Sequence, residues 1–147
     1  MKVAIGCDPN ALFLKEVLKE EIIKAGHSML DFGSDDPIYA NTALDVALSV
    51  SRGEADRGIL VCGTGLGMCL AANKVPGAYA AVCSDIYSVE RSILSNNANI
   101  LTMGAFTVGV ELAKMLVRRW LELTYVPGGR SEPKIQRIYE IEKDYMK

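Results

Sequence analysis

Short apolar runs alternate with helical patterns along the whole chain, and this alternation constrains the fold more than any other feature. Runs typical of strands occupy residues 2–7, 28–32, 57–62, 78–82 and 100–103. The segments between them carry apolar residues at the three- and four-residue spacing of helices. Strands that alternate with helices form βαβ units, which build a parallel sheet with helices on both faces. The sequence therefore predicts an α/β fold around a mainly parallel sheet.

Six helices are predicted between and after these strands. The first has Asn10 as its N-cap and ends at Gly26, since glycine suits the left-handed residue that follows many helices. The others are predicted at 42–52, directly after Gly67, at 88–95, at 109–123 and at 133–145. The last helix follows a Pro-Gly-Gly break, so it either packs on its own sheet or reaches another subunit. No repeat or shift in composition divides the chain, and we expect one domain over residues 1–147.

Composition and charge argue against several classes of protein. The 147 residues include 16 basic and 18 acidic side chains with no basic cluster, so we expect binding neither to nucleic acid nor to a membrane surface. Apolar runs are shorter than the roughly 20 residues that a membrane-spanning helix needs. No signal peptide is visible at the N-terminus, and we expect a cytoplasmic protein.

Four cysteines and a single histidine limit the available chemistry. The cysteines form no Cys-x-x-Cys pair, and in a reducing compartment they remain thiols. We expect no zinc site, because such sites combine several Cys and His ligands. His27 lies in a predicted turn from helix to strand, opposite to the ligand-binding edge of an α/β sheet, and is interpreted as structural. Catalysis is therefore expected from Cys, Asp, Glu, Tyr or Lys.

The segment 59–68 is the strongest candidate for a functional site. It reads Ile-Leu-Val-Cys-Gly-Thr-Gly-Leu-Gly-Met, a strand that enters a loop with three glycines before a helix. Several backbone N–H groups of such a loop can converge on one anionic oxygen. The segment lacks the Lys-Ser/Thr of a P-loop and follows the third strand, so nucleotide binding is not indicated. Cys62 beside these donors is either a base or nucleophile, or simply a small buried residue at a strand end.

Polar residues at other turns add candidates whose roles stay open. Asp8 follows the first strand and either caps a helix or binds ligand hydroxyls. Asn96 and Asn99 precede the fifth strand, where their amides either bind a polyol or cap turns. Arg130 and Lys134 follow the Pro-Gly-Gly break and suit a phosphate or carboxylate, with a solvated arginine as the plain alternative.

Several short motifs span nearly the whole chain. They are Ile-Gly-Cys-Asp at 5–8, Gly-Glu-Ala-Asp at 53–56, the glycine-rich segment 58–67, Ala-Ala-Asn-Lys at 71–74, Asn96 with Asn99, Gly-Val-Glu-Leu-Ala-Lys at 109–114 and Gly-Gly-Arg at 128–130. Together they resemble the ribose-5-phosphate isomerase B and galactose-6-phosphate isomerase family of aldose–ketose isomerases. The resemblance implies a Rossmann-like three-layer sandwich with a five-stranded sheet and a C-terminal helix used in dimerisation. It also implies a homodimer or dimer of dimers with shared active sites, and no cofactor or metal.

The resemblance further implies an isomerisation by proton transfer through an enediolate. A base takes a proton from the carbon beside a carbonyl, and fixed donors stabilise the oxyanion that forms. Cys62 is implied as the base, with Thr64 at the end of the sugar where protons move. The residues implied to bind substrate are Asp8, Tyr39, Gly63, Gly65, Gly67, Asn96, Arg130 and Lys134. Tyr39 is expected in the loop before the second helix, and Arg130 is expected to hold the phosphate.

Four positions depart from the well-known members of this family. Pro9, Ser95 and Ser131 stand where those members have histidine, and Phe106 stands where many have arginine. The ring-opening group and part of the phosphate clamp are therefore changed, while the base and its loop remain. We expect a substrate other than ribose 5-phosphate, such as an open-chain tetrulose phosphate. Two alternatives stay open: one subunit of a hetero-oligomeric isomerase, or a catalytically silent sugar-binding protein.

Overall fold

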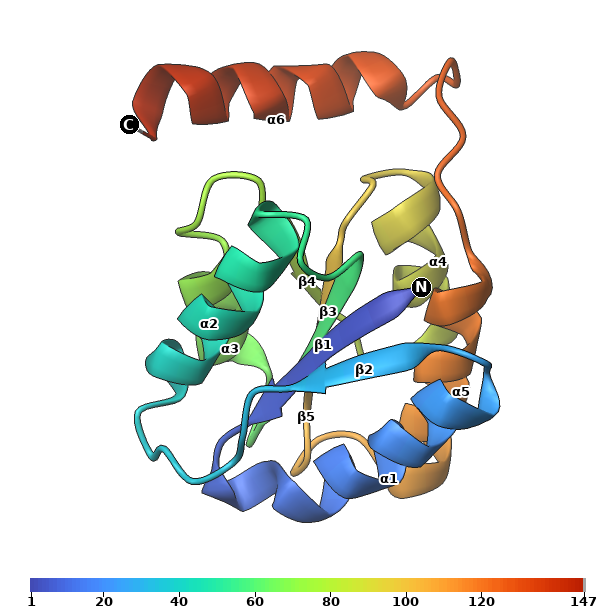
Figure 1. Cartoon of the computed structure of the whole chain (residues 1–147). Coiled ribbons are helices and arrows are strands. Elements are labelled where there is room, and N and C mark those ends of the chain that lie inside the picture. The colour runs from blue at the N-terminus through green and yellow to red at the C-terminus, as the bar shows by residue number, and fades with distance from the viewer. Residues whose placement is uncertain (147) are drawn as a thin grey trace.

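A parallel sheet forms the centre of the molecule, as the computed structural model shows for residues 1–146 (Figure 1). The strands of this part of the chain are β1 (Lys2–Cys7), β2 (Ser28–Asp31), β3 (Arg57–Cys62), β4 (Ala80–Val82) and β5 (Ile100–Gly104). They lie in the order β2-β1-β3-β5-β4, and every pair is parallel. The predicted α/β fold with a five-stranded parallel sheet is therefore confirmed.

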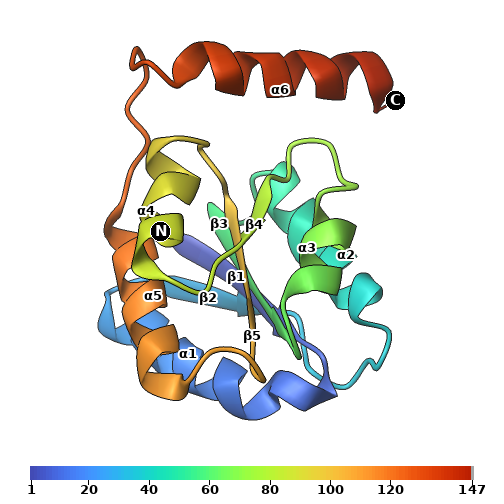
Figure 2. The same ribbon diagram turned by 180° about the vertical axis from the view of Figure 1, so that it is seen from behind.

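Helices cover both faces of this sheet (Figure 2). They are α1 (Leu12–Lys24), α2 (Tyr39–Ser51), α3 (Leu66–Ala72), α4 (Ile86–Leu94), α5 (Val110–Glu122) and α6 (Glu132–Tyr145). α2 and α3 pack on one face, and α1, α4 and α5 pack on the other. Ile59 of β3 belongs to the core under α1, α4 and α5, while its neighbour Leu60 belongs to the core under α2 and α3. Within residues 1–146, none of the helices is long and apolar enough to cross a membrane.

The central strands match their predicted ranges most closely. β1 and β3 begin and end at the predicted residues, since strands buried on both faces read as continuous apolar runs. β4 lies at one edge of the sheet and begins at Ala80 instead of residue 78, because the Ala78 N–H bonds the Val75 carbonyl in a turn. β2 ends at Asp31, one residue before the predicted end, and β5 continues one residue further, to Gly104.

The start of α1 differs from the prediction. Asn10 does not cap it; the carboxylate of Asp8 instead accepts the Asn10 N–H at 3.1 Å, at the start of a short 3₁₀ turn, Pro9–Ala11. Pro9 suits the first position of this turn because it has no N–H that needs a partner. α1 itself begins at Leu12 with no side-chain cap. Its predicted end is confirmed, since Gly26 follows it with a φ of 84°.

Aspartates before α2 and α4 start these helices earlier than the apolar spacing predicts. α2 begins at Tyr39 instead of residue 42, after Asp36 accepts a backbone N–H two residues further on at 2.7 Å. Tyr39 therefore lies in the helix and not in the loop before it. α4 begins at Ile86 instead of residue 88, because Asp85 caps it by accepting an N–H of its first turn at 2.7 Å. α5 and α6 lie within one residue of their predicted ranges.

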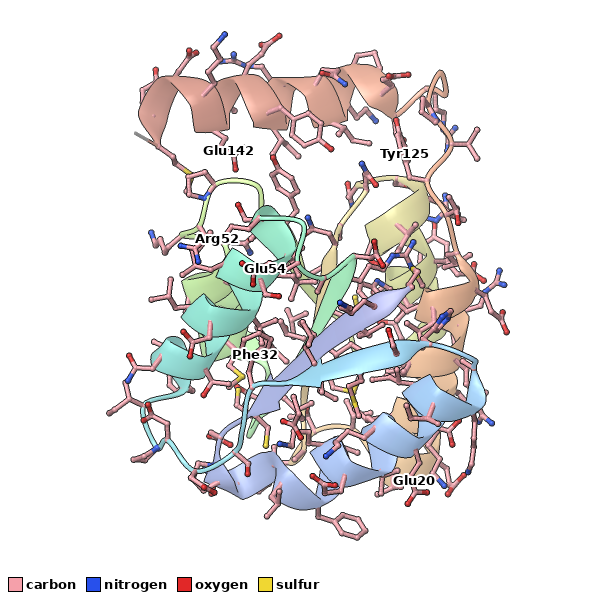
Figure 3. All side chains as sticks on the ribbon, in the orientation of Figure 1. Glu20, Phe32, Arg52, Glu54, Tyr125 and Glu142 are labelled. Atoms are coloured by element: carbon pink, nitrogen blue, oxygen red, sulfur yellow. The ribbon has the colours of Figure 1, made fainter. Side chains whose placement is uncertain are left out.

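α6 crosses the amino-terminal end of the sheet of its own chain (Figure 1). Glu142 points from α6 toward the rest of the chain (Figure 3), where its carboxylate accepts the N–H of Gly77 and the hydroxyl of Tyr79, both at 2.8 Å. The ring of Tyr139 packs on Tyr79 with centroids 5.1 Å apart, and its hydroxyl accepts the Asn97 amide at 3.1 Å. Gly77 and Asn97 precede β4 and β5, so this helix docks where those strands begin.

Candidate active site

Cys62 ends β3 at the carboxyl edge of the sheet and faces the glycine loop. The residue is 4% exposed, and the backbone N–H of Gly65 donates to its Sγ at 3.1 Å. Gly65 has a φ of 79°, and a Cβ there would lie 2.8 Å from the backbone of Met103. Only glycine therefore allows the loop to turn so closely over β5. The loop holds the sulfur in place with a backbone donor.

The three other cysteines lie in different environments. Burial raises the pKa of Cys7 and of Cys83 to about 11, so both thiols stay protonated at neutral pH. Both residues are buried in the apolar core. Cys69 is half-buried; its thiol donates to the Ala80 carbonyl at 3.4 Å, and burial raises its pKa as well. Of the four cysteines, Cys62 is the one whose sulfur is bound by the loop.

Two aromatic rings pack directly on glycines of the segment 63–67. A Cβ at Gly67 would lie 2.4 Å from the ring of Tyr39, and a Cβ at Gly63 would lie 3.0 Å from the ring of Phe106. Because α3 begins at Leu66, Gly67 is a residue of that helix and not of the loop before it, contrary to the prediction. Tyr39 is 43% exposed and Phe106 is 72% exposed, so both rings line the outer side of the loop.

Thr64 and Gly65 already have partners inside the loop. Thr64 is exposed, and its hydroxyl accepts the N–H of Leu66 at 3.3 Å. The N–H of Gly65 donates to the Cys62 sulfur. The loop therefore orders its own sulfur and hydroxyl groups, and the contacts of its amides with a substrate oxygen stay a prediction.

Asp8 lies beside Cys62 at the same edge of the sheet. β1 and β3 are neighbours, with Cys7 paired to Val61, and the Asp8 N–H donates to the Val61 carbonyl at 3.3 Å. Asp8 is buried, and its carboxylate accepts both the backbone and the side-chain N–H of Asn10, at 3.1 and 3.3 Å. Of the two roles left open for Asp8, capping is observed, and binding of ligand hydroxyls stays a prediction.

A second group of predicted residues lines a separate pocket, which we call the basic pocket. It has a volume of about 360 Å³. Its lining residues come from α4, the turn after α4, the loop before α6 and the first turn of α6: Tyr87, Arg91, Ser95, Asn96, Arg130, Ser131 and Lys134. Asn99 has a different role, because its side chain accepts the Tyr79 N–H at 2.7 Å and holds the turn before β4.

The basic pocket and the Cys62 loop lie toward opposite ends of the sheet. Cys62 pairs with Gly104, the last residue of β5, whereas Asn96 comes before Ile100, the first residue of that strand. At about 3.3 Å per residue, the strand alone separates the two ends by about 13 Å. A small sugar phosphate is shorter than that. Within one chain the structure brings together Asp8, Tyr39, Cys62, Gly63, Thr64, Gly65 and Gly67, and it places Asn96, Arg130 and Lys134 elsewhere.

Sequence reasoning missed two residues of the basic pocket, Tyr87 and Arg91. The Nη1 of Arg91 donates to the hydroxyl of Ser95 at 3.2 Å, and its guanidinium lies 5.8 Å from the centroid of the Tyr87 ring. The available signal was their spacing, because residues four apart share one face of a helix.

His27 precedes β2, at the opposite end of that strand from the carboxyl edge, as predicted. Its Nδ1 lies 3.2 Å from the amino group of Met1, and burial together with that positive group lowers the pKa of His27. In the part of the chain that the structure describes, no group of three or more His, Cys, Asp or Glu side chains could hold a metal ion.

Known proteins resemble this chain over almost all of its length. A family model described as Ribose/Galactose Isomerase matches residues 3–138. The D-erythrulose-4-phosphate isomerase of Pectobacterium atrosepticum is 41% identical over 142 residues, which cover 94% of this chain and 93% of that protein. The ribose-5-phosphate isomerase B of Escherichia coli is 42% identical over 145 residues, 97% of both chains. The solved structure of the Clostridium thermocellum ribose-5-phosphate isomerase B is 43% identical, covers 99% of both chains and has a TM-score of 0.93. The chain therefore belongs to the ribose/galactose isomerase family of sugar-phosphate isomerases.

Proposed function

We propose that this chain interconverts the aldose and ketose forms of a short, open-chain sugar phosphate, with Cys62 as the base. The observation that carries the proposal is the position of the Cys62 sulfur, which is held by the Gly65 N–H at the carboxyl edge of the sheet, beside Asp8. Ligands of open α/β sheets bind at this edge. Beside Cys62, the exposed Thr64 offers a hydroxyl and the half-exposed ring of Tyr39 lines one side of the site.

The proposed reaction moves protons and breaks no carbon–carbon bond. The thiolate of Cys62 takes a proton from the carbon beside the carbonyl, and the electron pair of that C–H bond forms the enediolate. A proton then passes between the two oxygens, and Cys62 returns its proton to the former carbonyl carbon. Donors of the loop and Thr64 stabilise the oxyanion between these steps. The reaction needs neither an oxidant nor a reductant.

Three of the four changed positions support a substrate that is already open. Pro9 and Phe106 offer no side-chain hydrogen bond, and Ser95 is not an acid–base group near neutral pH. A pentose 5-phosphate closes into a ring and needs such a group to open it. A tetrose 4-phosphate has no free hydroxyl in position to close a five-membered ring. The relative from Pectobacterium atrosepticum is named for a compound of this four-carbon class.

We also propose that the active form is a homodimer or a dimer of dimers, in which the Cys62 loop of one copy meets the basic pocket of another. The separation of the two groups within one chain supports this assembly, because Arg130 and Lys134 would otherwise have no reacting group near them. Large apolar side chains are also exposed where helices follow the carboxyl ends of strands: Leu12, Phe13, Tyr39, Leu66, Leu70 and Phe106. A second copy would cover them. A monomer at micromolar concentration in sedimentation velocity would contradict the proposal.

Replacing Cys62 tests the assignment of the base. Cys62→Ala should lower turnover by at least about 10²–10⁴-fold with the fold intact, since a positioned acid–base group contributes roughly that much. Exchange of substrate hydrogen with deuterated water should fall in parallel. Cys69→Ala is the matched control, because it removes a half-buried thiol outside the loop and should keep both rates. Near-normal exchange in Cys62→Ala would transfer the role to another group, with Asp8 first.

Matched tetrose, pentose and hexose phosphates test the substrate. We expect the highest kcat/KM for a four-carbon ketose or aldose phosphate, and a clear preference for ribose 5-phosphate would contradict this. If the purified chain binds these compounds without turning any over, it is either one subunit of a hetero-oligomeric isomerase or a catalytically silent sugar-binding protein. Recovery of turnover with a second, different subunit would then indicate a hetero-oligomeric isomerase, and no recovery would indicate a sugar-binding protein.

A further inference from the structure

Arg91 lines the basic pocket, and its side chain is held by contacts with residues of α4 and the turn after it. Its Nη1 donates to the Ser95 hydroxyl one turn further along α4, at 3.2 Å. The exposed ring of Tyr87, one turn earlier, lies 5.8 Å from the guanidinium carbon. Ser95 and Tyr87 thus fix the direction of the Arg91 side chain, and the guanidinium is ordered before any ligand binds.

The Nε of Arg91 is buried and has no hydrogen-bond partner in residues 1–146. A buried donor without a partner is unfavourable, and most buried donors in proteins are satisfied. Because Nε is closed to the pocket, the terminal nitrogens of Arg91 are the donors that an acceptor in the pocket can meet. The guanidinium presents its donors in a planar fork that matches two oxygens of a phosphate.

Three cations meet in this pocket without a counter-charge. Arg91, Arg130 and Lys134 form no ion pair within residues 1–146, whereas Arg119 and Arg137 pair with glutamates. Among the residues that the structure describes, no acidic residue lines the pocket. Glu132 lines the smaller pocket next to it, but its carboxylate accepts the backbone N–H of Gly128. Like charges that converge without a partner favour an anionic ligand.

We propose that Arg91 binds the phosphate of the substrate together with Arg130 and Lys134, and that this third cation selects a dianionic end group over a monoanionic one. The proposal rests on the proposed function for the identity of the substrate, and on the pocket itself for the anion. Arg91 contributes this third positive charge from the middle of α4. Ser95 acts as a positioning residue that holds the guanidinium.

Binding of inorganic phosphate to the purified protein tests the proposal. Arg91→Met keeps the length and the apolar stem of the side chain but removes the fork and the charge. A hydrogen bond to a charged group is worth a factor of about 10–100 in affinity, so we expect the Kd for phosphate at pH 8 to rise by about that much. Arg91→Lys, which keeps only the charge, should fall between. An unchanged Kd in folded Arg91→Met would overturn the proposal.

Arg137→Met is the matched control for the lost charge. Arg137 lies on α6 close in sequence to Lys134, is exposed and pairs with Glu140 at 3.0 Å, outside the pocket. The Kd of Arg137→Met for phosphate should match that of the unchanged protein within about twofold. A weakening as large as that of Arg91→Met would show that only net charge matters and would overturn the role of Arg91.

A comparison of two small anions needs no variant and covers the case in which Arg91→Met fails to fold. Methyl phosphate is a dianion at pH 8, and methanesulfonate is a monoanion of similar size. We expect the unchanged protein to bind methyl phosphate at least about tenfold more tightly, which is the effect of one charge-assisted contact. Equal binding would overturn the selection of a dianion.

Kinetics separate a failure of this proposal from a failure of the proposed function. In Arg91→Met, kcat/KM for a tetrose phosphate should fall, while kcat/KM for the unphosphorylated tetrose should not. A fall of both would indicate a structural role for Arg91. If the chain isomerises no sugar phosphate but binds phosphate through Arg91, the proposed function fails and the anion site stands. If the chain isomerises a sugar phosphate and Arg91→Met binds phosphate normally, the role of Arg91 fails and the proposed function stands.

Discussion

Replacing Arg57 with methionine should destabilise the fold without changing the reaction. Arg57 begins β3, and its guanidinium donates to the carbonyls of Trp120 at 2.7 Å and of Leu123 at 2.5 Å, at the end of α5. The same guanidinium lies 5.1 Å from the centroid of the Trp120 ring. The last carbonyls of a helix have no partner within it. Arg57 therefore caps α5 from the neighbouring strand.

The size of the effect follows from these contacts. Hydrogen bonds to a charged group contribute about 1.5–3 kcal/mol each, and a cation–π contact contributes about 0.5–1 kcal/mol. Burial works against them, because it takes water from the guanidinium and lowers the pKa of Arg57. Methionine avoids that penalty and keeps the apolar stem. We expect a net loss of about 2–4 kcal/mol in the free energy of unfolding, or roughly 5–15 °C in Tm for a chain of this length.

Urea unfolding followed by circular dichroism measures this loss. Arg118→Met is the matched control on α5, since Arg118 is half exposed and makes one ion pair, with Glu21 at 3.7 Å, in place of two hydrogen bonds to the end of the helix. Because Arg57 lies at the opposite end of β3 from Cys62, kcat of the folded variant should not change. A loss no larger than that of Arg118→Met would refute the capping argument.

Acid should weaken the fold through Asp31, where burial opposes ionisation but hydrogen bonds from two lysines of α1 and a backbone N–H outweigh it and hold the pKa at about 2. Because this pKa is below the ordinary value of Asp, the ionised Asp31 stabilises the fold by about 1–2 kcal/mol above about pH 4, and this stabilisation is lost as the pH falls through 2. In Asp31→Asn, the free energy of unfolding in urea should therefore depend less on pH in that range. Gly67→Ala should displace the ring of Tyr39 and lower kcat/KM by about tenfold with little change in Tm, whereas the same change in a Tyr39→Ala background should cost nothing more. Glu142→Ala should remove both hydrogen bonds to the turn before β4, lower the free energy of unfolding by about 1–3 kcal/mol and expose α6 to protease; unchanged proteolysis would contradict the docking of α6.

Apolar patterns predict the strands and the bodies of the helices better than the helix starts. β1 and β3 are recovered in full because, after the first residue of each strand, every residue is buried and carries the apolar signal. α2 and α4 begin earlier than predicted because Asp36 and Asp85 satisfy N–H groups at their starts. These hydrogen bonds depend on residues outside the apolar face, which the spacing of apolar residues does not record.

Local sequence likewise predicts some contacts of the candidate site and not others. The contact between Cys62 and Gly65 lies within one short loop, so the local sequence predicts it. The contact between Tyr39 and Gly67 joins two helices, and only the resemblance to a family indicated that Tyr39 lines the site. Arg91 carried no motif at all. Which face of α4 turns toward the start of α6 depends on how the helices pack, and that information is spread over the whole chain.

The direction of the strands and the docking of α6 together determine what each copy of the chain contains. In a parallel sheet, a residue that follows one strand and a residue that precedes another lie at opposite edges, so Cys62 and Asn96 do not meet within one copy. Glu142 holds α6 on its own chain, which keeps Arg130 and Lys134 beside α4 without help from a second copy. Each copy therefore has its basic pocket before any association. In the proposed dimer, a partner has to add only the reacting end with its thiol, and the phosphate end of the substrate can bind first.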